Sequence, residues 1–291
     1  MLLSQEQIDQ YHSNGYVVVQ NVLTEEDLAP VISAYAEFID RRAQELKAEG
    51  KIKNLFEDEP FERRFAKLFA ESQEIQYGLD IMEARLEPMF NFLRNDNLLD
   101  VVESLLGKEI TCNPIQHIRG KVPAEIHSGP SSLNVPWHQD AAVTTEEADQ
   151  SDIITFWLPL VDAVAETGCM EVIPDVWKQG ELKHYSNDGT TIVPEQMPKA
   201  DPVLVPCLKG GIVIMNKYTP HRGTWNVSDI VRWSIDLRYQ RTGEPTGRSS
   251  HPDFVVRSEA NPDSVLNDYK QWCEMWKEAL SANTGQKLHR V

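Results

Sequence analysis

A histidine and an aspartate separated by one residue, His138 and Asp140, have the types and spacing of two ligands for one metal ion. Side chains of an extended strand alternate between its two faces, so residues two apart project from the same face. A second histidine, His221, follows a predicted strand and a proline far downstream. Two imidazoles and one carboxylate form the facial triad of non-haem Fe(II) sites, which leaves adjacent metal positions open. The pattern therefore predicts that His138, Asp140 and His221 form a catalytic metal triad.

An isolated His-x-Asp pair can also be a surface histidine beside an aspartate, so further residues must distinguish a metal site from this alternative. Arg232 lies in the predicted strand after the second histidine, between apolar neighbours. A buried arginine needs a carboxylate partner, and its planar guanidinium can bind one in bidentate fashion. A dicarboxylate co-substrate that chelates the metal at its other end would supply this partner. A structural ion pair of Arg232 with Asp236 or Asp162 is the alternative.

The stretch before these residues is predicted to be mostly helical. Helix-capping patterns at Ser4 and Thr24, together with apolar residues at helical spacing, set the helix boundaries. The predicted elements are a helix over 4–14 that ends at Gly15, a strand over 16–19, a helix over 24–48, and helices between 61 and 106, the last of them capped by Asp96.

After Gly107 the pattern changes to short strands, predicted over 110–118, 153–158, 168–173, 203–205, 211–215 and 231–239. Many short strands with Gly and Pro turns indicate a sandwich or barrel. A helix is predicted within 262–282, with Trp272 and Trp276 in the core or on a self-association face. We expect one domain over 1–291, with a largely helical part over 1–107, a β core over 108–240 and a C-terminal loop and helix over 241–291.

Composition narrows the class of protein. The chain has 291 residues and a net charge of −17, which argues against nucleic acid or an anionic membrane surface as the main partner. Its four scattered cysteines are expected to be free thiols in a reducing compartment. No signal peptide or membrane span is predicted, so we expect a cytoplasmic protein that acts on a small molecule. The sequence does not indicate an oligomeric state.

The chain resembles the phytanoyl-CoA dioxygenase family of Fe(II)/2-oxoglutarate-dependent oxygenases. The resemblance is strongest in the stretches 137–140, 156–160, 167–174 and 220–223. It implies a double-stranded β-helix, a cupin-like jelly roll, over 108–240, with Fe(II) bound by His138, Asp140 and His221. It also implies 2-oxoglutarate and O2 as co-substrates, with Arg232 binding the distal carboxylate of 2-oxoglutarate.

The resemblance further implies a basic residue on the strand before the His-x-Asp loop. Lys121 is the candidate and Arg119 the alternative, and Trp157 is expected to line the co-substrate pocket. The implied activity is hydroxylation or another oxidation of a small organic metabolite, with release of succinate and CO2. A halogenase of this kind lacks the carboxylate ligand, so the presence of Asp140 favours hydroxylation. The turn over 174–177 departs from the family's Pro-Gly-Ser-His, and we expect it near the rim of the site, where it would affect substrate choice.

Other polar residues give weaker indications. Alternation puts His117 and Arg119 on one strand face and Gln116 and Ile118 on the other, and His117 is expected to be structural rather than a fourth ligand. Asn134 and Gln139 could contact substrate or support the site. The remaining loop histidines are expected to be exposed: His127, His184 and His251. A non-catalytic barrel that binds a metal or small ligand, and a zinc-dependent hydrolase on the same fold, are the alternatives, although a hydrolase gives Arg232 no role.

Overall fold

The computed structural model describes residues 1–127, 135–186, 189–282, 285 and 289. Its helices are α1 (Gln5–Asn14), α2 (Glu25–Ala48), α3 (Phe61–Glu71), α4 (Ile81–Ala84), α5 (Glu87–Phe92), α6 (Asp96–Leu106) and α7 (Tyr269–Ala282). Its strands are β1 (Tyr16–Val19), β2 (Ile110–Cys112), β3 (His117–Lys121), β4 (Ile154–Pro159), β5 (Met170–Val172), β6 (His184–Ser186), β7 (Thr190–Ile192), β8 (Val203–Val205), β9 (Ile212–Asn216), β10 (His221–Gly223), β11 (Arg232–Arg241) and β12 (Phe254–Arg257).

The first two helices begin and end where the sequence predicts. Ser4 and Thr24 each cap a helix through a complete capping box. Gly15 ends α1 in the left-handed conformation, with φ +81°. The helical stretch over 61–106 is divided into α3 to α6, because Arg85 ends α4 in a left-handed conformation and Leu86 starts α5 afresh. The predicted cap of α6 is wrong by one residue: the side chain of Asn95, not Asp96, accepts the Leu98 N–H.

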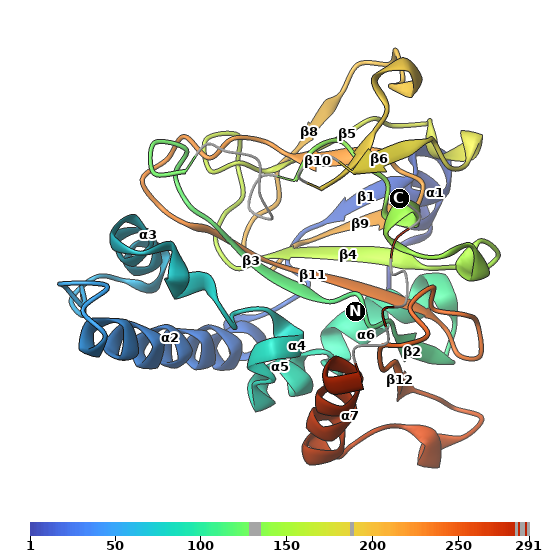
Figure 1. Cartoon of the computed structure of the whole chain (residues 1–291). Coiled ribbons are helices and arrows are strands. Elements are labelled where there is room, and N and C mark those ends of the chain that lie inside the picture. The colour runs from blue at the N-terminus through green and yellow to red at the C-terminus, as the bar shows by residue number, and fades with distance from the viewer. Residues whose placement is uncertain (128–134, 187–188, 283–284, 286–288, 290–291) are drawn as a thin grey trace.

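The strands form two antiparallel sheets that face each other, and a hairpin of β6 and β7 (Figure 1). The large sheet has the order β1-β9-β4-β11-β2-β12, with β3 also paired to β11, and the small sheet has the order β10-β5-β8. The single strand predicted over 110–118 is two strands, β2 and β3. Pro114 has no N–H to donate, and the Asn113 side chain accepts the Ile115 N–H, so the ladder is interrupted there.

The large sheet is buried on both faces, and alternate residues of each strand face different cores. In β4, Phe156 and Leu158 pack among the helices, whereas Trp157 packs toward the small sheet. In β9, Ile214 faces the helices and Val213 the small sheet. Helices α2 to α6 cover the first face, and β5, β8 and β10 lie across the second (Figure 1). This layered, open arrangement of antiparallel strands is the predicted jelly roll, supported by a helical N-terminal part.

Aromatic residues join the helices to the sheet. Trp233 of β11 stacks on Phe61 at 4.8 Å between ring centroids and meets Phe65 at 5.0 Å. Trp272 and Trp276 of α7 are fully buried, which confirms the core interpretation of this pair. In the described part of the chain, no helix combines the length and apolar character that a membrane crossing requires.

Candidate active site

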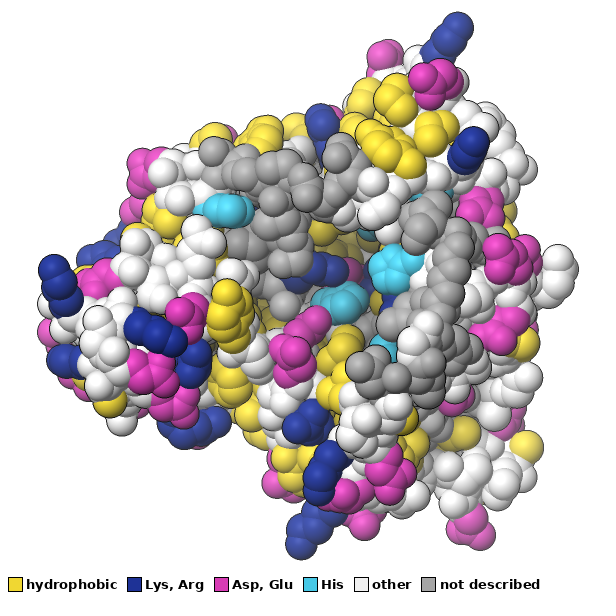
Figure 2. Space-filling view, viewed as in Figure 1, with side chains coloured by type: hydrophobic (Ala, Val, Ile, Leu, Met, Phe, Trp, Pro, Cys, Tyr) yellow, Lys and Arg dark blue, Asp and Glu magenta, His cyan; other side chains and the backbone are white. Residues whose placement is uncertain are grey.

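A cavity of about 450 Å³ opens between the two sheets. The cavity adjoins the hydrophobic core between the two sheets, because Trp157, Met170 and Met215 belong both to that core and to the cavity lining. Figure 2 shows a hollow in the middle of one face of the molecule, with histidine and basic side chains inside it. All the site residues predicted from the sequence line this cavity: His138, Asp140, His221, Arg232, Lys121, Arg119 and Trp157.

The predicted triad comes together at one wall of the cavity. One ligand atom each of His138, Asp140 and His221 lies within 4.8 Å of the others, and all three residues are buried. The two histidines pair through their backbones: the His138 N–H donates to the His221 carbonyl and the His221 N–H to the His138 carbonyl, with nitrogen-to-oxygen distances of 3.1 and 2.9 Å. The prediction that His138 and Asp140 share one strand is wrong. Asp140 begins a short 3-10 helix, Asp140–Val143, whose turn directs its carboxylate back to the imidazoles.

Backbone contacts fix which nitrogen of each imidazole faces the metal position. Nδ1 of His138 lies 2.9 Å from the Pro136 carbonyl, and Nδ1 of His221 lies 2.9 Å from the Thr219 carbonyl. A carbonyl only accepts, so each Nδ1 donates its proton and each Nε2 is the nitrogen left to face the metal position. These Nε2 atoms lie 3.8 and 4.0 Å from Oδ1 of Asp140.

The donor set suits Fe(II). Burial, reinforced by the neighbouring His221, lowers the pKa of His138 to about 3, so its imidazole is a neutral ligand at physiological pH. Neutral imidazoles with one carboxylate form a mixed N/O set that suits non-haem Fe(II) and that zinc also accepts. Because both kinds of metal fit these ligands, the rest of the cavity has to distinguish them.

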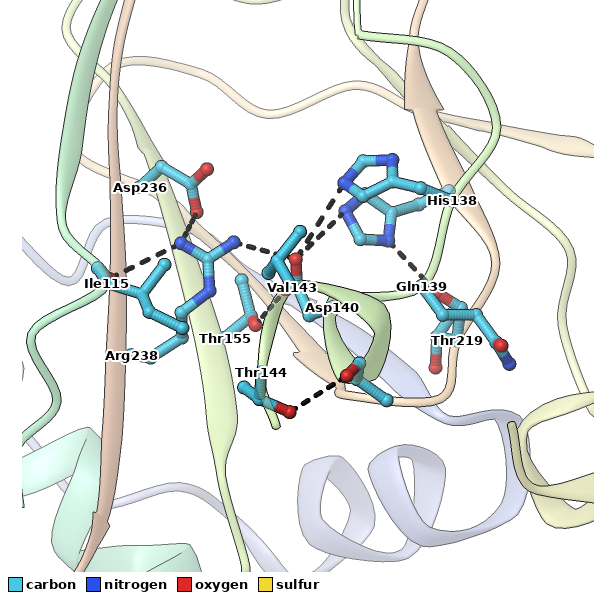
Figure 3. A network of polar contacts seen from close by, with 12 residues as sticks. Ile115, His138, Gln139, Asp140, Val143, Thr144, Thr155, Thr219, Asp236 and Arg238 are labelled. Atoms are coloured by element: carbon cyan, nitrogen blue, oxygen red, sulfur yellow. Dashed lines mark hydrogen bonds and ion pairs between the residues drawn. The ribbon is translucent and has the colours of Figure 1, made fainter. Parts of the chain in front are cut away.

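Arg238 is a site residue that the sequence interpretation missed. Its Nη2 lies 2.7 Å from Oδ1 of Asp140, and its Nη1 lies 3.1 Å from Oδ1 of Asp236. The hydroxyl of Thr155 donates to the other oxygen of Asp140. Figure 3 shows the Arg238 guanidinium between the two carboxylates, with the His138 imidazole beyond Asp140. Burial alone would raise the pKa of Asp140, but Arg238 and the imidazoles hold it far below its usual value, so the carboxylate stays ionised.

Gln139 and His184 hold the loops behind the triad. The Gln139 N–H donates to Nε2 of His184 at 3.1 Å, and its side chain bonds the backbones of Gly180, Tyr218 and Leu182. Gln139 therefore supports the site and does not line the cavity. The prediction that His184 is exposed is wrong: its exposure is 5%, because it serves as this acceptor.

The remaining polar residues singled out in the sequence are three histidines and Asn134. His127 and His251 are half-buried, not exposed, and Asn134 lies outside the described residues. Nδ1 of His117 lies 2.7 Å from Oδ2 of Asp80, in agreement with a structural role, although the ring also lines the cavity.

Lys121 and Arg232 form a second cluster, directly opposed on the paired strands β3 and β11. Nζ of Lys121 donates to the Thr224 carbonyl at 2.6 Å, and Nη1 of Arg232 donates to Oγ of Ser234 at 2.5 Å. The Arg232 guanidinium lies 5.1 Å from the Trp157 ring centroid, and its buried Nε has no hydrogen-bond partner among the described residues.

These two basic side chains have no carboxylate partner within 4.0 Å in the described part of the chain. The alternative pairing of Arg232 is not found, since Asp236 pairs with Arg238 and Oδ1 of Asp162 accepts the Lys209 N–H. Burial, followed by mutual repulsion, lowers the pKa of Lys121 to about 6, and burial lowers the pKa of Arg232 to about 10. Both side chains therefore lack the anion that would compensate their burial, which fits one carboxylate of 2-oxoglutarate.

The turn over 174–177 does not line the cavity. Nε1 of Trp177 donates to the Ser13 carbonyl at 3.3 Å. A Cβ on Gly15 would lie 2.3 Å from the same indole ring. The turn thus packs against the junction of α1 and β1.

Comparison with known proteins agrees with the fold and the site. The sequence profile of the phytanoyl-CoA dioxygenase (PhyH) family matches residues 11–234. Phytanoyl-CoA dioxygenase domain-containing protein 1 of Bos taurus is 21% identical over 262 residues, which cover 79% of this chain and 87% of that protein.

Solved structures share the jelly roll at low sequence identity. Apo ThoJ, a non-heme monooxygenase, has a TM-score of 0.61 at 17% identity, covering 96% of this chain and 99% of its own. The epimerase SnoN in complex with Fe3+, alpha ketoglutarate and nogalamycin RO has a TM-score of 0.57 at 18% identity, covering 84% and 87%. EvdO2 of Micromonospora carbonacea var. aurantiaca with 2-oxoglutarate has a TM-score of 0.52 at 18% identity, covering 82% and 91%. Together with the profile match over most of its length, these findings show that the chain belongs to the phytanoyl-CoA dioxygenase family of non-haem Fe(II)/2-oxoglutarate-dependent oxygenases.

Proposed function

We propose that this chain hydroxylates, or otherwise oxidises, a small organic metabolite with release of succinate and CO2. One observation carries the proposal. Two imidazoles and a carboxylate converge in the same cavity as two buried basic side chains that have no carboxylate partner among the described residues. Only a co-substrate that both chelates a metal and carries a distal carboxylate uses the two clusters together.

Each residue then has a separate role. His138, Asp140 and His221 bind Fe(II), and Arg232 and Lys121 bind the distal carboxylate of 2-oxoglutarate. Fe(II), 2-oxoglutarate and O2 supply the oxidising power through oxidative decarboxylation. Trp157 forms an apolar wall beside Arg232 and excludes water from that ion pair, which strengthens it. Arg238 holds Asp140 ionised and oriented, so the carboxylate is ready to bind the metal.

The substrate class rests on the cavity and on the relatives. About 450 Å³ is within the range of pockets for small molecules. The structural relatives include an epimerase and a carbocyclase from nogalamycin biosynthesis, so the fold supports several oxidations of small molecules. Asp140 occupies the ligand position that a halogenase keeps for halide, and this favours hydroxylation. The free state of all four cysteines supports a cytoplasmic location, where thiols stay reduced.

Neither alternative gives the two buried basic side chains a role. A zinc-dependent hydrolase or a non-catalytic metal-binding barrel would use the triad but would leave Lys121 and Arg232 uncompensated in the cavity wall. Such burial is costly unless a ligand supplies the opposite charge. Dependence of turnover on O2 distinguishes the hydrolase from the oxygenase.

The deciding experiment is an anaerobic titration with Fe(II) and then 2-oxoglutarate, followed through the visible charge-transfer band of the chelate. The wild type should form the band, and His221→Ala and Asp140→Ala should lose it together with Fe(II) affinity while keeping their circular dichroism. Arg232→Ala should bind Fe(II) normally but need far more 2-oxoglutarate. Arg241→Ala is the matched control, since this arginine of the same strand pairs with Asp152 outside the cavity. No band in folded wild type would refute the proposal.

A further inference from the structure

The cavity contains more positive charge than 2-oxoglutarate requires. Its described lining includes five basic side chains, Arg119, Lys121, Arg232, Arg238 and Arg248, and two carboxylates, Asp140 and Asp236. This excess stands out in a chain whose net charge is −17. One carboxylate of 2-oxoglutarate is assigned to Lys121 and Arg232 and the other to the metal. Arg119, Arg238 and Arg248, called here the second arginine group, are left outside that assignment.

The second arginine group is only partly neutralised by protein carboxylates. Arg238 lies between Asp140 and Asp236 (Figure 3). Nε of Arg119 lies 3.9 Å from Asp236, which is therefore shared by two arginines. Asp140 is also a proposed metal ligand, so its negative charge would be shared between Arg238 and the metal ion. Among the described residues, Arg238 therefore has both carboxylates within ion-pair distance, whereas Arg248 has neither.

Arg248 is the member of the group without a protein anion. Its Nε donates to the Val143 carbonyl at 2.8 Å, and its Nη2 lies 3.2 Å from Nε2 of His289. Over the described ranges, no carboxylate lies within 4.0 Å of its guanidinium nitrogens. Burial, followed by repulsion from Arg238, lowers the pKa of Arg248 to about 10, as expected for a cation that lacks a counter-charge.

The backbone around Arg248 is firmly anchored beside the triad. Gly247 has φ +72°, and a Cβ there would lie 2.5 Å from Cβ of Thr144. The Gly247 carbonyl accepts the Thr145 N–H at 3.1 Å, and the Arg248 N–H donates to Oγ1 of Thr246. The loop is thus fastened to the segment directly after Asp140. Arg248 is thus held in place and half-buried, and it has no carboxylate within 4.0 Å among the described residues, so its guanidinium is suited to meet an anionic ligand in the cavity.

We propose that the substrate carries an oxyanion, a carboxylate or a phosphate group, which Arg248 binds. This inference rests on the proposed function and narrows its substrate class. Arg248 then determines specificity: it places the anionic end of the substrate at one side of the cavity and leaves the oxidised carbon near the metal. A neutral molecule of the same shape would enclose the Arg248 guanidinium without giving it an anionic partner, so it should bind much more weakly.

The test uses anaerobic protein loaded with Fe(II) and saturating 2-oxoglutarate, so the site of Lys121 and Arg232 is filled. Dissociation constants are measured by calorimetry for matched probes on two carbon skeletons: butanoate, butyl phosphate and butanamide, and phenylacetate, phenyl phosphate and phenylacetamide. Wild type should bind an acid or a phosphate at least about tenfold more tightly than the amide. Whichever of acid and phosphate binds better identifies the group.

Variants then locate the binding. Arg248→Gln should remove the preference for the anion, Arg248→Lys should keep part of it, and Arg241→Gln, outside the cavity, should keep all of it. Equal binding of amide and anion, no anion binding at all, or an unchanged preference in Arg248→Gln would overturn the inference. If Arg248→Gln does not fold, the wild-type comparison of anion with amide decides alone. The charge-transfer band of the loaded protein is recorded first, so its absence reveals failure of the proposed function separately.

Discussion

Asp140 is held by an arginine before any metal binds. Its carboxylate is 3% exposed and accepts from Arg238 at 2.7 Å. An ionised carboxylate this deeply buried needs a partner, and Arg238 provides one that also pairs with Asp236. The guanidinium therefore keeps Asp140 ionised at neutral pH and also pairs with Asp236. Residues next to metal ligands often orient them in this way and tune their affinity.

Replacing Arg238 by Met should destabilise the metal-free protein more than the metal-bound protein. The variant leaves Asp140 buried without a partner, which costs about 3–5 kcal/mol of unfolding free energy. Mn(II) should recover part of this loss, because a divalent ion supplies the missing positive charge. Urea denaturation with and without Mn(II) measures both values, with Arg241→Met as the exposed control. An equal loss in both states would show that Arg238 does not act through Asp140.

The lowered pKa of Lys121 makes 2-oxoglutarate binding depend on pH. Its folded-state pKa of about 6 lies below the ordinary 10.5, because of burial and then Arg232. Above about pH 6 the free amine must take up a proton to meet the distal carboxylate. Affinity for 2-oxoglutarate should therefore fall as pH rises from 6 to 9, by at most about tenfold per pH unit. Calorimetry in buffers of different ionisation enthalpy should detect the proton uptake.

Lys121 should also make the unfolding free energy of the ligand-free protein rise with pH, whereas the affinity for 2-oxoglutarate falls. Between about pH 6 and 10.5 the unfolded chain binds this proton and the folded protein without 2-oxoglutarate does not, so stability rises with pH over this window. Lys121→Met should reduce the pH dependence of both the 2-oxoglutarate affinity and the unfolding free energy. A wild-type affinity that stays constant from pH 6 to 9 would contradict the assigned role of Lys121.

At the scale of elements, strand alternation places the chemistry. Along β11, Trp233, Ile235 and Leu237 face the helices, and Arg232 and Asp236 face the cavity. Along β3, Ile118 faces the helices, whereas its odd-numbered residues line the cavity. Two neighbouring strands thus present five polar side chains to one site: His117, Arg119, Lys121, Arg232 and Asp236, with Arg238 continuing the pattern on β11.

Gly120 lets β3 approach β11 closely, and its replacement should displace both basic neighbours. A Cβ at Gly120 would lie 2.9 Å from the six-membered ring of Trp233, which is held by Phe61 and Phe65. Gly120→Ala should lower the unfolding free energy by about 1–3 kcal/mol through overpacking and weaken 2-oxoglutarate binding by shifting Lys121. Thermal unfolding and 2-oxoglutarate titration measure the two effects.

A compensating variant provides the control for Gly120. Trp233→Leu removes the ring that the new methyl group would meet, so Gly120→Ala should cost less in that background than in the wild type. Additive losses in the double variant would show that the destabilisation comes from strand propensity and not from this contact.

Local patterns made much of this arrangement predictable. Capping boxes located α1 and α2, and the alternation of apolar and polar residues placed Arg119 on the cavity side of β3. The same alternation from Arg232 through Asp236 to Arg238 would have found Arg238, had the polar face of β11 been followed to its end.

Two errors at the site, at Asp140 and His184, involve contacts between segments that are distant in the sequence. The backbone of His138 pairs with that of His221, which is far away in the sequence. The pairing ends there, and the chain turns into the 3-10 helix that begins at Asp140. His184 is buried because it accepts the Gln139 N–H. The cap of α6 differs by one residue, since neighbouring Asn and Asp serve as caps equally well and local sequence does not decide between them.

At the scale of the whole molecule, one core joins the helical part to the sheet. Buried residues of α2, α3, α6 and α7 belong to the same cluster as those of β4 and β11. The C-terminal segment adds β12 to the edge of the large sheet and supplies Arg248 to the cavity. We propose on this basis that 1–291 is a single folding domain, in which no part is stable without the others.

One cooperative unfolding transition should follow, and ligands should shift all of it. Mn(II) with 2-oxoglutarate, each at about 100 times its dissociation constant, should stabilise the fold by about 2.7 kcal/mol per ligand. The shift should be equal by far-ultraviolet circular dichroism, dominated by the helices, and by fluorescence of tryptophans such as Trp157 in the cavity wall and Trp276 in α7. If the helical signal melted earlier and did not respond to ligand, the helical part would be an independent unit and the cavity would depend on the sheets alone.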